Sequence, residues 1–160
     1  MSGQEKSSKL LNSIGVFLLA WALYSIYAAI IVFIDLGESN QLQFEDPANF
    51  IFIILLIKMV TFIVLYFFGG IGLLFRKNFG WIIALSICVL TVITRSTFVW
   101  HRIEIEQIDS SVWMQGTGMV LCAISAGLLL SKTIRGHFKL EVFDYVIGGG
   151  IIVINFFFEF

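Results

Sequence analysis

Four long apolar stretches constrain this chain more than any other feature of its sequence. They cover residues 14–34, 50–75, 81–100 and 112–130. A helix needs about 20 mostly apolar residues to cross the hydrocarbon core of a bilayer, and each stretch is of that order. Lipid offers no hydrogen-bond partner to the backbone, so spanning segments satisfy their own polar groups as helices. The sequence therefore predicts an all-α fold, a multi-pass membrane helix bundle.

A fifth apolar stretch, residues 142–158, is shorter and holds Asp144, three consecutive glycines and Asn155. It has three alternatives: to span the membrane with tilt, to lie at the interface, or to re-enter. The first stretch is too long for the apolar region of a signal peptide, so we expect it to be retained. The connectors are short and leave no room for a soluble catalytic domain. We expect residues 1–160 to form a single membrane-embedded helical domain.

The composition agrees with a membrane protein and excludes some partners. Hydrophobic residues make up 59% of the chain and charged residues 13%, with a mean hydropathy of +0.96. Charged residues are thus about half as frequent as in soluble domains, where they make up about a quarter. The net charge of −1 provides no basic patch, which argues against nucleic-acid binding.

The basic residues outside the apolar stretches predict the orientation of the chain. Seven of the ten fall on one side of the predicted bundle, whereas the first connector on the other side holds only acidic charges. Cytoplasmic loops are enriched in Lys and Arg, so this side is expected to be cytoplasmic, together with the N-terminus. A bacterial cytoplasmic membrane is the default location. The seven residues are Lys6, Lys9, Arg76, Lys77, Lys132, Arg135 and Lys139.

Each of the four long stretches has one helical face of small and polar residues. Membrane helices associate through small residues and interhelical hydrogen bonds, so we expect these faces to pack against one another. The predicted faces are Trp21, Tyr24, Ser25, Ala28 and Asp35; Lys58, Thr61, Leu65, Gly69 and Gly72; Ala84, Cys88, Thr91 and Arg95; and Gln115, Gly118, Cys122 and Ser125.

Two basic residues, Lys58 and Arg95, lie inside the apolar stretches. Lys58 lies eight residues from Phe50, and Arg95 lies five residues from Trp100. These separations correspond to depths of about 12 Å and about 7–8 Å from the outer side. A basic side chain at the centre of a membrane helix costs about 2.5–3.5 kcal/mol, so such residues usually face the bundle interior and have a partner.

Two interpretations of these cations remain open. In the first, they reach outward to the membrane surface or pair with carboxylates that fix the helix register. The candidate carboxylates are Asp35, Asp109, Glu45 and Asp46. In the second, the cations line an outward-opening polar cavity suited to a lipid head group or a small anion. The candidate residues of that cavity are Lys58, Arg95, Gln115, Tyr24 and Asp35, with Tyr27 as an alternative to Tyr24.

The sequence indicates no catalytic site, cofactor or metal. His101 and His137 fall on opposite sides of the membrane, so one chain cannot ligate a haem with both. No zinc-protease, hydrolase or phosphate-loop pattern is present. Cys88 and Cys122 lie on polar faces at similar depth and are expected to be neighbours. No further metal ligand occurs at that depth.

Three hypotheses for function follow. The leading one is an accessory, assembly or regulatory subunit of a membrane complex, with the lipid bilayer and another membrane protein as partners. The alternative is a homo-oligomeric pore or anion transporter, in which Lys58 and Arg95 repeat around an axis. The third is a lipid-modifying or quinone-reactive enzyme at the outer interface. The residues of that third site are His101, Arg102, Glu104 and Glu106.

Overall fold

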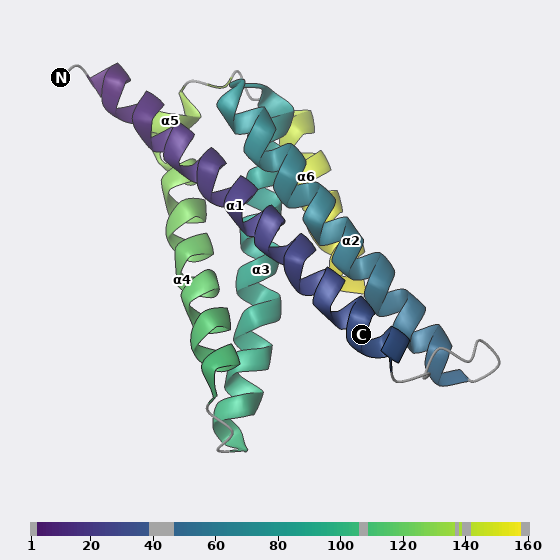
Figure 1. The fold of residues 1–160 in the computed structure, drawn as a ribbon. Helices are drawn as coiled ribbons and strands as arrows, with labels where there is room; N and C mark the ends of the chain where they lie inside the picture. Colours follow the sequence, from purple (N-terminus) through teal and green to yellow (C-terminus); the bar gives the residue numbers. More distant parts are fainter. Residues whose placement is uncertain (1–2, 39–46, 106–108, 137, 139–141, 158–160) are drawn as a thin grey trace.

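A computed structural model describes most of the chain as helices (Figure 1). The described residues are 3–38, 47–105, 109–136, 138 and 142–157. No strand occurs among them, so the predicted all-α fold is confirmed. The helices are α1 (Gly3–Glu38), α2 (Pro47–Leu74), α3 (Asn78–Glu104), α4 (Ser110–Leu130), α5 (Lys132–Arg135) and α6 (Val142–Phe157).

Four of the described helices, α1 to α4, are long and apolar enough to cross a membrane, as predicted from the sequence. The fifth stretch forms α6, a shorter helix of 16 residues with a length of about 24 Å. It begins beside the start of α3, where the rings of Trp81 and Tyr145 meet edge to face. Farther along, the Ser86 hydroxyl donates to the carbonyl of Gly148 at 3.2 Å. Helix α6 therefore runs alongside α3 in the same direction.

The four long helices pack as two antiparallel hairpins, α1 with α2 and α3 with α4. Where α1 meets α2, Gly15 lies against Leu74 and Leu19 lies against Gly70. The indole N–H of Trp81 donates to the Leu129 carbonyl at 3.0 Å and ties α3 to α4. The first hairpin is thus held by close backbone approach, and the second by a buried hydrogen bond.

The two hairpins join through a tight turn between α2 and α3. A Cβ added at Gly72 would lie 2.4 Å from the Cα of Gly80, so only glycine allows the two backbones to come so close. Arg76 in this turn has φ 53°, a left-handed conformation, and its guanidinium donates to the Ser8 hydroxyl on α1. The turn is therefore fixed to both neighbouring helices.

The bundle is packed tightly at one end only. We call the end where α1 begins and α2 and α4 finish the closed end, and the opposite end the open end. Among the described residues, α2 has no buried residue before Tyr66, and α3 has none after Thr91. Figure 1 shows the α1–α2 hairpin diverging from the α3–α4 hairpin toward the open end. The hydrophobic core therefore lies at the closed end, and the molecule is forked.

Candidate functional site

A cavity of about 440 Å³ lies in the fork, between the tightly packed core and the open end. We call it the fork cavity. All four long helices contribute to its wall. The lining residues are Ser25, Lys58, Met59, Phe62, Tyr66, Thr94, Arg95, Phe98 and Gln115. Three of the residues proposed from the sequence, Lys58, Arg95 and Gln115, therefore lie around one cavity, although they come from three different helices.

The remaining sequence candidates lie elsewhere. Tyr24 does not line the cavity, because adjacent helix residues point about 100° apart and its neighbour Ser25 faces inward instead. The Tyr24 hydroxyl donates to the sulfur of Met114 at 3.0 Å and links α1 to α4. Tyr27 is 62% exposed. The side chain of Asp35 lies outside the described part of the structure.

The α2 face that carries Lys58 holds aromatic residues beside the predicted small and polar series, whose Gly69 and Gly72 pack against α3. The sequence interpretation followed small and polar residues from Lys58 through Thr61 and Leu65. In the structure, the cavity wall instead follows a spacing of four, from Lys58 to Phe62 and Tyr66. Both series share a helical face with Lys58, since residues three and four apart are neighbours. The sequence interpretation considered small and polar residues only, and it therefore missed the aromatic series.

The two cations are half-buried in the cavity wall, Lys58 on α2 and Arg95 on α3. No carboxylate among the described residues lines the cavity, and Arg95 forms no ion pair with any of those carboxylates. The side chains of Glu45 and Asp46, two of the suggested partners, lie outside the described residues. The described part of the cavity wall thus contains two basic side chains and no carboxylate.

Asp109, another suggested partner of the cations, has a different role. Its carboxylate accepts hydrogen bonds from the backbone N–H groups of Ser111 and Val112, at 3.0 and 3.1 Å, and from the Ser111 hydroxyl at 2.6 Å. The Ser111 hydroxyl and the Val112 N–H lower the pKa of this carboxyl below its usual value. Asp109 is therefore the N-cap of α4, as is common for Asp before a helix.

Two buried polar atoms on α1 and α4 have no hydrogen-bond partner within the described protein. They are the side-chain oxygen Oε1 of Gln115 and the indole Nε1 of Trp21. The Trp21 ring packs over Gly118, one turn along α4 from Gln115. Leaving such a buried group unpaired costs about 1–3 kcal/mol. The Gln115 oxygen is therefore an acceptor that a donor in the cavity would satisfy.

Four polar side chains close the cavity toward the closed end. The hydroxyls of Tyr66 and Thr91 hydrogen-bond to each other between α2 and α3. Next to them, Cys88 on α3 interacts with Cys122 on α4, and Cys122 also contacts Tyr66 and Thr91. This contact confirms the prediction that the two cysteines are neighbours, and both are fully buried free thiols. The described residues contain no group of three metal-ligating side chains.

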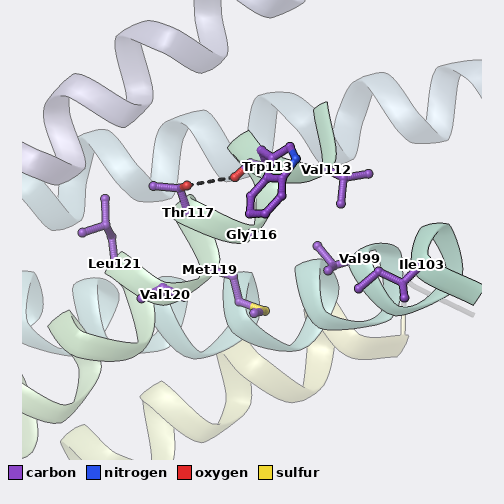
Figure 2. A pocket seen from close by; sticks show the side chains of 9 residues that line it. All are labelled: Val99, Ile103, Val112, Trp113, Gly116, Thr117, Met119, Val120 and Leu121. Atoms are coloured by element: carbon purple, nitrogen blue, oxygen red, sulfur yellow. Dashed lines mark hydrogen bonds between the residues drawn. The ribbon is translucent and has the colours of Figure 1, made fainter. Parts of the chain in front are cut away.

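A second cavity, of about 470 Å³, lies between α3 and α4 near the open end (Figure 2). Its lining is almost entirely apolar, and Trp113 beside it is 73% exposed. The Thr117 hydroxyl donates to the Trp113 carbonyl at 2.8 Å, so it is already satisfied within its own helix. This groove suits hydrocarbon, but it lacks the charge and the unpaired polar atom that distinguish the fork cavity.

The residues of the hypothetical interfacial enzyme site lie on the last turn of α3. His101 and Glu104 are exposed, and the Arg102 guanidinium lies over the Phe98 ring, 5.5 Å from its centre. Glu106 lies outside the described residues. This cation–π contact gives Arg102 a role in covering the aromatic wall of the fork cavity.

The fork cavity therefore combines two cations, an unpaired acceptor and an aromatic wall, and it is the candidate site of this protein. Comparison of the chain with protein-family models, with curated proteins and with solved structures finds no match.

Proposed function

We propose that this protein is a non-catalytic membrane protein that binds an anionic ligand in the fork cavity. The observation that carries the proposal is the presence of Lys58 and Arg95, from different helices, around one cavity that also holds Gln115. An anion in the cavity is attracted to both side chains, and this attraction is stronger in a low-dielectric setting than in water. The site supplies charge and shape, and no hydrogen bond between a nucleophile and a base is found among its described lining residues other than Lys58.

The proposed orientation places the closed end in the cytoplasm. Five basic residues whose side chains the structure describes lie at this end, whereas Arg102, Glu104 and Asp109 lie at the open end. Lys and Arg are retained on the cytoplasmic side of bacterial membrane proteins. In this orientation the fork cavity opens toward the outer leaflet. The five basic residues are Lys9, Arg76, Lys77, Lys132 and Arg135.

Binding is better supported than conduction through a single chain. A pore needs a continuous path, but Tyr66 in the cavity wall hydrogen-bonds to the buried Thr91, with Cys88 and Cys122 packed beside them. An anion held above these residues has no described route onward through the same chain. Ligand binding without chemistry fits a regulatory or assembly subunit, which we keep as the cellular role of the proposal.

To test the proposal, the protein is released from its own membrane under conditions that retain bound species, and the mass of the complex is measured. We expect the wild type to carry an anionic species, and the double variant Lys58→Gln/Arg95→Gln to lose it. Each replaced cation should weaken binding about tenfold to a hundredfold, since a charge-assisted contact is worth about 1.5–3 kcal/mol. Lys77→Gln, an exposed residue of the α2–α3 turn, is the matched control and should retain the ligand. Retention of the same anion by the double variant would refute the proposal.

A further inference from the structure

We propose that the ligand is a lipid with an anionic, hydroxyl-bearing head group of the phosphoglycerol class. This inference rests on the proposed function and names its ligand. The phosphate lies between Lys58 and Arg95, a head-group hydroxyl donates to Oε1 of Gln115, and the acyl part lies against the aromatic wall.

The size of the cavity argues against a small inorganic anion as the ligand. A water molecule occupies about 30 Å³ of liquid, so 440 Å³ corresponds to about 15 such volumes. Phosphate, with five non-hydrogen atoms, would fill a minor part of that space. A ligand that excludes water from the cavity must be several times larger.

The chemistry of the wall shows that the larger part of such a ligand is hydrocarbon. Met59, Phe62 and Phe98 line the cavity together with the two cations. Phe98 is 37% exposed, so the aromatic wall continues to the surface of the protein within the membrane. A wall with cations in one part and apolar side chains in another is complementary to an amphiphile.

The fork gives a lipid a direct route to the site. The hairpins diverge toward the open end (Figure 1), and none of the described α2 residues before Tyr66 is buried. A lipid already in the bilayer reaches the cavity sideways, without crossing water. A soluble anion would have to leave water and travel past apolar helix surfaces to reach Arg95.

The unpaired Gln115 oxygen selects among anionic head groups. This atom is buried and has no partner within the described protein, so a ligand that donates a hydrogen bond to it gains a contact that an acceptor-only head group lacks. A phosphodiester alone offers only acceptors, whereas the hydroxyls of a glycerol head group are donors. Choline offers no donor, and its positive charge would meet the two cations.

The experiment compares two lipids of equal charge that differ in the hydroxyl groups. The full chain is placed in nanodiscs of phosphatidylcholine with either phosphatidylglycerol or phosphatidylmethanol, and bound lipid is counted by native mass spectrometry. We expect wild type to prefer phosphatidylglycerol over phosphatidylmethanol by about fivefold to tenfold, the value of one hydrogen bond. Gln115→Met should bind the two lipids equally. Thr117→Val, on another face of α4, is the matched control and should keep the preference.

The other outcomes separate this inference from the proposed function. Equal binding of both anionic lipids by wild type, each above phosphatidylcholine, would overturn the hydroxyl assignment and leave anion binding intact. Binding of inorganic phosphate to delipidated protein, as tight as that of either lipid, would overturn the lipid assignment and also leave anion binding intact. Absence of any anion from wild type would overturn both.

Thermal unfolding of Gln115→Met checks that the variant is folded. We expect a midpoint equal to or above that of wild type, because the variant has no unpaired buried acceptor at this position.

Discussion

At the scale of single residues, Gly118 makes room for the Trp21 ring, which reaches from α1 to α4. A Cβ at this position would lie 2.4 and 2.6 Å from two ring carbons of Trp21, which is closer than side chains pack. Gly118→Ala should therefore displace the Trp21 ring and lower the free energy of unfolding by about 1–3 kcal/mol, a typical cost of overpacking. The change is measured as a lower thermal unfolding midpoint in detergent.

Gly116 in the same helix provides the control for this prediction. A Cβ at Gly116 would meet nothing within 4 Å, and alanine is a better helix former than glycine. Gly116→Ala should therefore leave the midpoint unchanged or raise it. Equal midpoints for the two variants would show that Trp21 does not pack on Gly118 as described.

The candidate site was predictable from the sequence where its residues contrast with their surroundings. Lys58, Arg95 and Gln115 are polar residues in apolar stretches, and their depth and helical face were enough to single them out. Phe62 and Phe98 gave no such signal, because a phenylalanine that lines a cavity has the same sequence context as one that faces lipid. The choice between them depends on how neighbouring helices rotate, which is a tertiary property.

At the scale of elements, the start of α4 depends on the charge of one cap. The hydrogen bonds from Ser111 and Val112 hold the pKa of Asp109 below its usual value, which is about 3.9 when unfolded. Because the pKa is lower in the folded state, the cap makes its full contribution to stability at pH values above the unfolded-state pKa. This contribution is lost as the pH falls through the folded-state pKa. We therefore expect the backbone N–H groups of Ser111 and Val112 to lose protection from hydrogen exchange below about pH 4.

Asp109→Asn separates the charge from the cap. Asparagine still accepts hydrogen bonds at an N-cap but does not titrate in this range. Protection at Ser111 and Val112 in this variant should therefore be independent of acid pH once intrinsic exchange is corrected. A wild type that shows the same acid-independent protection would mean that the Asp109 charge does not hold the end of α4.

The sequence predicted the positions of the long helices better than it predicted the residues at which they begin and end. The apolar stretches gave all four long helices, because about 20 apolar residues in a row leave few alternatives. The structure extends α1 back to Gly3 and α3 on to Glu104, beyond the apolar residues. Backbone hydrogen bonds continue a helix into polar sequence, and hydropathy does not report that continuation. The four residues of α5 depend on local capping, in which Ser131 accepts from the Ile134 N–H.

At the scale of the whole molecule, the proposed orientation is open to chemical labelling. The native thiols Cys88 and Cys122 are fully buried, whereas Ser110 at the open end and Thr133 at the closed end are exposed. A membrane-impermeant maleimide added to intact bacterial cells should modify Ser110→Cys. It should reach Thr133→Cys only after permeabilisation. The opposite pattern would reverse the orientation and place the fork cavity on the cytoplasmic side.

Because the molecule is forked, its two ends take up different lateral areas in a bilayer. The parted hairpins occupy more lateral area on the side of the open end than the tightly packed helices occupy on the other side (Figure 1). Tension and lateral pressure in a bilayer act on area, and a close-packed core barely compresses. In a bilayer, we therefore expect crowding of the wider side to favour hairpins that lie closer together, and stretching to favour hairpins that lie farther apart. The mechanical state of the membrane is then expected to bias the width of the cavity.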